Sequence, residues 1–502
     1  MSAIDADAMT SRTGRPGAQR SYPESIRILL RLALLELRRS PMPLMLPMVA
    51  GLFWFDALRS GQGLPAIWTQ RAAILPDHVL PDLGPISAGM AAWIGGRERR
   101  RGMGDLAEST ARPRWLRQLA AWGGALGWTL LAYAACTAVV YLLAAHDSSW
   151  GGPPIWPVVV TGLAIAVFCT TGFVAGAVFP SRFTAPLAAI GTLFVSIQIF
   201  QSAVSATAGW VLISPNNSVP ELDWGVFHPV PPDLAIVQTV FLAGLVVVLL
   251  GVLGVLGSAR GAQLRRTASA VTVVGLAACV AGLGVAATAT LGGYGYDVPL
   301  LHNAASDRAL PYTPDCTQGS AIPVCIHPAF STELPGASAA FAPVLAEVAG
   351  LPGAPARATQ IDLADLPLLD PNQQGNDISR YGAWSALAKS SSGAPVLEYG
   401  FGDSNTFTRS GGVGYLRSQA AQLVIGNVIA PNGTPGPVQQ AVELALLQNA
   451  GAVAPPKTAS PGSDVAAAAK RFAALPSAQT HAWLVAHLDS LRAGQITLGE
   501  LP

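Results

Sequence analysis

Seven long apolar stretches alternate with short polar segments over the first 293 residues. Most of them contain the roughly 20 residues that a helix needs to cross about 30 Å of hydrocarbon. The first is the weakest, with only about 18 residues and with Pro41, Pro43 and Pro47. The stretches lie at about 41–58, 79–96, 118–145, 155–179, 184–206, 233–257 and 269–292. The pattern predicts an α-helical polytopic membrane protein of about seven transmembrane helices, with its transmembrane domain over residues 24–293.

Residues 24–40 have a different pattern, with charged and apolar side chains on opposite sides of a helix. Glu24, Arg27, Arg31 and Arg38 form one stripe, and mainly leucine and isoleucine lie opposite. Such a helix is typical of the membrane interface, and we place it on the inner leaflet. The alternative is that it is only the charged start of the first span.

Residues 1–23 are polar, lack the apolar core of a secretory signal, and are interpreted as a disordered cytoplasmic tail.

Basic residues are distributed unevenly among the polar segments and set the expected orientation. The N-terminal region and the links at 97–117, 180–183 and 258–267 contain 7, 7, 1 and 3 Lys and Arg residues. The short links between them contain only Arg59 and Arg71. Because cytoplasmic loops are enriched in basic residues, the N-terminus is predicted to be cytoplasmic. With seven spans, the C-terminal domain is then extracellular, on the far side of the cell (plasma) membrane.

Composition agrees with this division. The chain has 51% hydrophobic and 12% charged residues, against about 25% charged residues in a soluble domain. The part up to residue 293 has 20 Lys and Arg against 14 Asp and Glu, and the remainder has 10 against 15. A basic and an acidic part are expected if the two lie on opposite sides of a membrane.

The C-terminal part is predicted to be an α+β, mainly helical, extracytoplasmic domain over residues 311–502, after a linker at 294–310. Pro- and Gly-rich breaks separate its elements. Apolar periodicity predicts helices near 337–350, 413–430, 436–450, 463–474 and 477–492, and strands near 357–363 and 395–401.

Small and polar residues inside the spans have two interpretations. Gly123 with Gly127 and Gly172 with Gly176 are spaced for close helix packing rather than for transport. Gln198 and Gln201 lie in the fifth span, where an amide needs a hydrogen-bonding partner. We interpret them as interhelical hydrogen-bonding groups, with contacts to a substrate path as the alternative.

The longest predicted cytoplasmic link runs from Gly96 to Trp115. It begins with a basic run, breaks at Gly-Met-Gly and then predicts a short polar helix over about Asp105 to Ala111. A short helix across the cytoplasmic ends of two spans would let a soluble motor act on the membrane part. The alternative is a loop whose positive charge only sets topology, and both can hold together.

This region resembles that of type-2 ABC exporter permeases, the transmembrane subunits of those transporters. The likeness rests on the interfacial helix and on a Glu-Arg-x-x-Gly-x-x-x-x-Leu-like segment formed by Glu98, Arg99, Gly102 and Leu106. It covers residues 24 to about 257, and the layout is also similar to uncharacterised actinobacterial permeases. A seventh span and an exterior domain depart from many simple members, which end after six helices.

The resemblance implies an ATPase-coupling segment at Asp105, Leu106 and Glu108 that docks on a separate cytoplasmic ABC ATPase. It also implies a homodimer or heterodimer of permease chains in the lipid bilayer. We expect no nucleic-acid partner, no cofactor and no ATP hydrolysis by this chain. The best match to a phosphate-binding loop, Gly451 to Thr458, has Pro456 where the second glycine is needed.

Cys316 and Cys325 have eight residues between them and lie in the predicted exterior domain. In an oxidising compartment this spacing predicts a disulfide. A metal site is the alternative, but His327 alone adds too few ligands. The other three cysteines, Cys136, Cys169 and Cys279, lie inside apolar stretches.

Other polar residues of this domain give weaker indications. His481 and His487 lie six apart and so do not form an i, i+4 zinc pair. Glu333, Asp362 and Asp365 are the residues that would join His327 in a hydrolytic site.

The leading hypothesis for the whole chain is an exporter permease. The alternatives are a membrane-anchored extracytoplasmic binding or sensor protein without transport activity and, less favoured, an exterior hydrolase.

Overall fold

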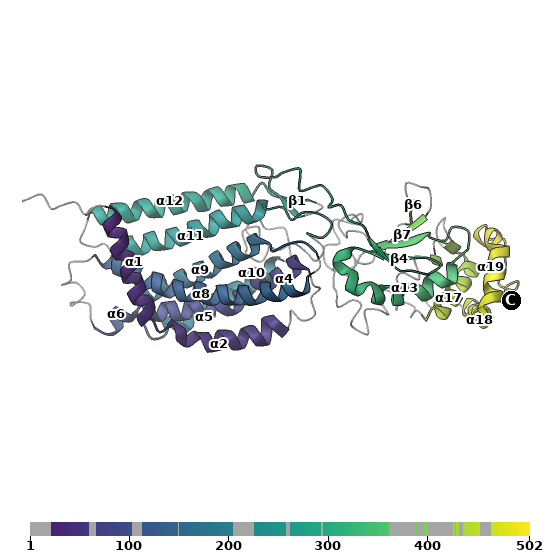
Figure 1. The fold of residues 1–502 in the computed structure, drawn as a ribbon, viewed down its shortest axis with the longest axis horizontal. Coiled ribbons are helices and arrows are strands. Elements are labelled where there is room, and N and C mark those ends of the chain that lie inside the picture. The colour runs from purple at the N-terminus through teal and green to yellow at the C-terminus, as the bar shows by residue number, and fades with distance from the viewer. Residues whose placement is uncertain are drawn as a thin grey trace, which may run out of the picture.

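The fold was obtained as a computed structural model, and Figure 1 shows a bundle of long helices with smaller helices and a sheet gathered at one of its ends. The structure describes residues 22–59, 67–102, 113–148, 150–203, 225–257, 262–292, 295–360, 387–389, 395–399, 425–426, 428–430, 435–451 and 463–502.

Helices occupy all seven predicted apolar ranges, but they differ in their ability to cross a membrane. Four of the described helices are long and apolar enough: α8 (Arg114–Asp147), α9 (Ile155–Val178), α11 (Asp233–Gly257) and α12 (Ala262–Ala286). A fifth candidate is the pair Leu30–Arg39 and Met42–Leu58, which together form one span bent by 48°. The remaining two ranges hold α5 (Leu80–Gly95) and α10 (Thr184–Ala203). The apolar helices indicate a membrane protein.

The bend in that pair separates α1 (Tyr22–Arg39) from the helical segment that follows it. This segment consists of η1 (Met42–Met45), α2 (Leu46–Leu52) and the π-helical η2 (Phe53–Leu58). Three prolines between residues 41 and 47 interrupt the backbone hydrogen bonds of a continuous helix, which accounts for a bend here. In Figure 1, α1 crosses one end of the bundle instead of running along it.

Glycines allow the bundle to pack closely, as predicted. A Cβ at Gly172 of α9 would overlap the carbonyl oxygen of Ala88 in α5, and one at Gly176 would overlap that of Ala92. On α8, a Cβ at Gly127 would lie 2.9 Å from the side chain of Leu37 in α1. Packing between backbones is the usual role of small residues in membrane helices, and close packing is confirmed for Gly172 and Gly176. A Cβ at Gly123 would make only an ordinary 3.6 Å contact with the Cβ of Ala33.

Indole and hydroxyl groups supply hydrogen bonds between the helices. Trp122 of α8 donates to the hydroxyl of Thr170 in α9 at 3.0 Å, and Trp115 donates to the carbonyl of Leu250 in α11 at 3.1 Å. The Tyr133 hydroxyl donates to the Val158 carbonyl at 2.9 Å. Where water is scarce, each bond satisfies a donor that would otherwise be costly to bury.

The described residues of the C-terminal part form a sheet of five strands in the order β3-β4-β5-β7-β6. β4 pairs with β5 and β5 with β7 in parallel, whereas β3 with β4 and β6 with β7 are antiparallel. The strands are β3 (Asp315–Cys316), β4 (Val324–Ile326), β5 (Arg357–Gln360), β6 (Leu387–Lys389) and β7 (Pro395–Tyr399). The predicted strands near 357 and 395 are confirmed as β5 and β7, and the other three were not predicted.

Four of the five predicted C-terminal helices are confirmed. They are α13 (Leu334–Val348), α17 (Pro437–Asn449), α18 (Ser463–Ala473) and α19 (Ser477–Arg492). Most of the fifth, at 413–430, lies outside the described residues. A 3-10 helix, η6 (Pro328–Glu333), precedes α13. Phe341 of α13 and Phe472 of α18 are almost fully buried in the same apolar core.

The segment expected to be a linker, residues 294–310, packs against the bundle. It contains β2 (Gly295–Asp297), which pairs with β1 (Thr290–Gly292) after α12. Val298 is fully buried beside Leu234 and Val237 of α11. The connection to the sheet is therefore held to the end of the bundle along part of its length.

Candidate coupling site

The end of the bundle crossed by α1 contains the residues that lead into and out of the predicted coupling segment. Helix α5 continues into the short α6 (Arg97–Arg100), and α8 begins at Arg114. Figure 1 shows α1 and α6 at this end and the C-terminal sheet at the other. The predicted coupling segment between α6 and α8, with Asp105, Leu106 and Glu108, lies outside the described residues.

Two ion pairs join the three helices at this end. Arg97 of α6 donates to both carboxylate oxygens of Glu36 in α1, at 3.0 and 3.2 Å. Glu98 lies 3.6 Å from Arg117 in the first turn of α8. All four side chains are between 19% and 33% exposed, so water screens the charges only in part. The two pairs thus fix the positions of α6 and the start of α8 relative to α1.

Aromatic side chains reinforce the same joint. The Trp128 indole of α8 donates to the carbonyl of Leu37 in α1 at 2.7 Å. The Arg100 guanidinium lies 4.3 Å from the ring centre of Trp93, at the end of α5, and such a cation–π contact favours a fixed guanidinium position. Neither contact was predicted, and the contact of Trp128 with Leu37 joins residues 91 positions apart, which leave no local pattern.

Gly102 ends the helical turn that follows α5 and α6, at the position of the predicted Gly-Met-Gly break. Its φ is +64°, a conformation that glycine adopts without a steric penalty. Its backbone N–H donates to the carbonyl of Arg99 at 3.1 Å, which closes the last turn after α6. The chain therefore leaves the helix at a defined residue before the coupling segment.

Gln198 and Gln201 lie on α10, in the last two turns of that helix. The backbone there is described and helical, but the two side chains are outside the described atoms. Their assignment as interhelical hydrogen-bonding or substrate-contacting groups stays a prediction.

The predicted disulfide between Cys316 and Cys325 is present, and it links paired residues of β3 and β4. It joins two adjacent strands of the C-terminal sheet. A metal site here is not supported: within the described parts of the chain, no group of three or more His, Cys, Asp and Glu residues is placed to hold a metal ion.

We expect removal of this disulfide to loosen the strand pair without unfolding the bundle. By the chain-entropy relation, closing so short a loop contributes about 2 to 3 kcal/mol. Thiol labelling of the denatured Cys316→Ala variant should reveal Cys325 as one additional reactive thiol. In the unreduced natural chain, only Cys136, Cys169 and Cys279 should react, and labelling of all five cysteines would contradict the bond.

His327 lies beside this strand pair and is buried among the aromatic rings of Tyr312, Trp150 and Phe227, which we call the aromatic box. Its ring centre is 4.2 Å from that of Tyr312, 4.5 Å from that of Trp150 and 4.9 Å from that of Phe227. Trp150 precedes α9 and Phe227 precedes α11. The box therefore joins the C-terminal sheet to two connections of the helical bundle.

Burial lowers the pKa of His327 to about 4, so the ring is neutral at pH 7. Nδ1 accepts a hydrogen bond from the Ala329 backbone at 3.1 Å, which leaves the ring hydrogen on Nε2. Nε2 is buried and has no hydrogen-bond partner among the described residues. The imidazole thus acts as a packing element and as a cap for η6.

A second contact holds residues 297–307 to the bundle. His302 Nδ1 lies 3.2 Å from an oxygen of Asp233, at the start of α11, and Nε2 lies 3.1 Å from Asp307. The hydrogen bond with Asp307 is the largest of the effects that raise the pKa of His302, and Asp233 and Asp297 add to it. Protonation of His302 therefore strengthens this attachment.

The residues proposed for a hydrolytic site are not brought together by any observed contact. His327 is fully enclosed. Burial raises the pKa of Glu333, and Asp362 and Asp365 lie outside the described residues. His487 stacks on Trp483, with ring centres 4.7 Å apart, while His481 lies six residues earlier on α19.

Sequence reasoning missed Trp150, Phe227 and Tyr312, which lie in connections where no periodic pattern applies. An aromatic residue beside a predicted membrane boundary was the only signal.

Searches of protein-family models, curated proteins and solved structures found no match to this chain.

Proposed function

We propose that this chain is the permease subunit of an ABC-type exporter, driven by a separate cytoplasmic ATPase. The observation that carries the proposal is the joint formed by α1, α6 and the start of α8. The described chain stops at Gly102 and resumes at Pro113 beside this joint, where the Glu98–Arg117 ion pair links α6 to the start of α8. A force on the coupling segment between these two residues would therefore act on α5 and α8 together.

The packing inside the bundle supports transmission of such a movement. Backbone contacts at Gly172 and Gly176 join α9 to α5, so a displacement of α5 moves α9 with it. Trp115 ties the first turn of α8 to α11. ATP binding by the partner would shift the coupling segment and re-pack these helices as a unit.

The proposed topology has seven spans, a cytoplasmic N-terminus and an extracytoplasmic C-terminal domain. Two arrangements support it. Basic α6 and the amphipathic α1 lie at one end of the bundle, and the disulfide-containing sheet lies at the other (Figure 1). Helix α8 has 34 residues and is about 51 Å long at 1.5 Å per residue, so it can span the hydrocarbon and extend beyond it.

Partner chains complete the proposal. A homodimer or heterodimer of permease chains fits the exposed apolar side chains of α10, where Leu187, Ile190 and Phe194 are 63% to 65% exposed. In a membrane, lipid and a second permease chain would share these surfaces. The C-terminal domain would receive the substrate, gate its exit or contact another protein.

Replacing both Asp105 and Glu108 with Lys should weaken association with the ATPase and lower ATP hydrolysis by the complex. Both positions belong to the proposed docking segment, and the change adds repulsive positive charge. A matched control is Asp464→Lys with Asp489→Lys, which makes the same charge change at two exposed positions of the C-terminal part. Co-purification and ATPase assays in nanodiscs measure the effect.

Equal association of the ATPase with both double variants would count against this function. Stable insertion of the chain without any ATPase partner would instead favour the membrane-anchored binding or sensor protein. In that case the joint at α1 would serve only to fix the topology.

A further inference from the structure

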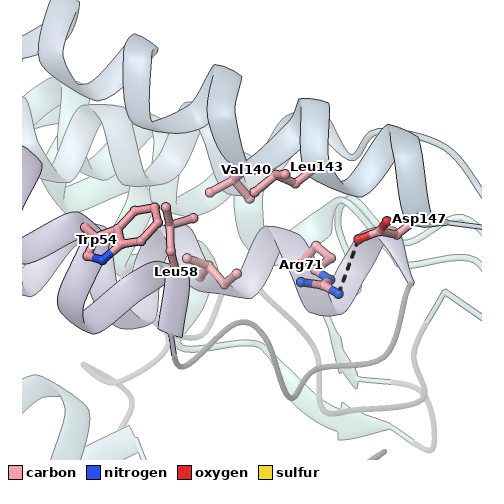
Figure 2. Close-up of a pocket in the computed structure, with 7 residues that line it drawn as sticks. Trp54, Leu58, Arg71, Val140, Leu143 and Asp147 are labelled. Carbon is pink, nitrogen blue, oxygen red and sulfur yellow. Dashed lines mark ion pairs between the residues drawn. The ribbon is translucent and has the colours of Figure 1, made fainter.

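A groove lies between the helix that ends at Leu58, α4 (Trp68–Ile74) and the last turns of α8. Its volume is about 360 Å³. The residues that line it are Trp54, Leu58, Arg71, Ile74, Val140, Leu143 and Asp147. Figure 2 shows the apolar side chains along the groove and the Arg71–Asp147 pair at one end.

The apolar walls face the surroundings of the bundle. Trp54 is 67% exposed and Leu143 is 45% exposed, while Val140 and Ile74 form a buried floor. Because α8 is one of the four helices suited to cross a membrane, lipid chains are the apolar material next to it. The groove therefore has the lining of a site for an acyl chain.

The polar end carries the Arg71–Asp147 ion pair, and the other carboxylate oxygen of Asp147 lies 2.8 Å from Nδ1 of the exposed His146. A guanidinium nitrogen of Arg71 lies 3.8 Å from a carboxylate oxygen of Asp147, and the two side chains are 14% and 42% exposed. The distance is longer than a hydrogen bond, so the pair is held by charge. A ligand with both charges could bind each member without removing its counter-charge.

Aromatic neighbours place this pair at the level of lipid headgroups. Asp147 is the last residue of α8. Trp68 lies one helical turn before Arg71, and its ring packs against Tyr141 of α8 with centres 5.7 Å apart. Trp and Tyr are enriched where the hydrocarbon meets the headgroups, and an Arg–Asp pair beside them lies at the same depth.

We infer that this groove binds one phospholipid with an ethanolamine headgroup. The Arg71 guanidinium donates two hydrogen bonds to the lipid phosphate in a bidentate contact. The primary ammonium of the headgroup donates to the Asp147 carboxylate. An acyl chain lies along Trp54, Leu58 and Leu143. The proposal requires the bundle to lie in a membrane but does not depend on an ATPase partner.

The headgroup chemistry separates this lipid from others with the same acyl chains. A choline headgroup has a quaternary ammonium without a hydrogen to donate to Asp147. A glycerol headgroup has no positive charge, so its phosphate would approach the Asp147 carboxylate without compensation. Selectivity for ethanolamine is therefore the property that distinguishes recognition from general solvation by lipid.

Native mass spectrometry of the purified full chain tests the inference. The protein is mixed with equal amounts of phosphatidylethanolamine, phosphatidylcholine and phosphatidylglycerol that have identical acyl chains. We expect the ethanolamine lipid to be retained about tenfold over the others, which corresponds to about 1.4 kcal/mol. Arg71→Gln and Asp147→Asn should each abolish the preference.

Two further variants control for folding and for general effects of charge. Leu143→Trp fills the groove but keeps the ion pair, and it should lower retention of all three lipids. Arg59→Gln removes a nearby exposed charge that does not line the groove, and it should leave the preference unchanged. Equal retention of the three lipids by the natural chain would overturn the inference, as would an unchanged preference in both Arg71→Gln and Asp147→Asn.

Discussion

Replacement of Gly172 or Gly176 by Ala should prevent normal assembly of the helical bundle. At each position the added methyl group overlaps a backbone carbonyl of α5, and a backbone cannot turn aside as a side chain can. Overpacking typically costs about 1 to 3 kcal/mol, and we expect each variant to reach or exceed the upper value. The measurement is the fraction of monodisperse protein after extraction, together with its thermal unfolding temperature.

Gly191→Ala on α10 and Gly284→Ala on α12 are matched controls for this prediction. Among the described residues, no atom outside the helix's own backbone lies within 4 Å of a Cβ built at either position. Both variants should retain the natural stability or gain a little, because alanine favours helix over glycine by about 0.8 to 1 kcal/mol. If all four variants behave alike, the close approach of α5 and α9 is wrong.

His327→Ala should detach the C-terminal sheet from the end of the bundle. The substitution empties a site enclosed by Tyr312, Trp150 and Phe227, and it removes the acceptor for the Ala329 backbone. Deleting a large buried side chain costs about 2 to 5 kcal/mol. Faster hydrogen exchange should appear around residues 324–330 and at the segments that contain Trp150 and Phe227.

His487→Ala is the control, because His487 is an exposed residue of α19 that stacks on one side of Trp483. Exposed substitutions usually change stability by no more than about 0.5 kcal/mol, so its exchange should match that of the natural chain. Exchange confined to the C-terminal sheet in His327→Ala, with Trp150 and Phe227 unaffected, would show that the box does not join the two parts.

The elements of this fold could be predicted far better than their contacts. Continuous apolar stretches locate α8, α9, α11 and α12, because a helix in lipid needs apolar side chains all round. The short strands β3 and β4 have two and three residues, too few for a visible alternation. The spacing of Cys316 and Cys325 did indicate the disulfide that links these two strands.

The candidate coupling site shows the same limit. The basic run and Gly102 could be recognised locally, because a helix end and a glycine turn depend on neighbouring residues. The pairing of Arg97 with Glu36 joins residues 61 positions apart, and no periodicity determines it. The role of residues 294–310 was likewise hidden, because burial of Val298 depends on the position of α11.

Affinity purification of the full chain from its native membrane tests the exporter proposal most directly. The chain is extracted with a mild detergent, and the bound proteins are identified and assayed for ATP hydrolysis. The proposal predicts a stoichiometric ATP-hydrolysing partner that is lost with Asp105→Lys and Glu108→Lys but kept with Asp464→Lys and Asp489→Lys. Recovery of the intact chain without an ATPase, under conditions that preserve other membrane complexes, would contradict it.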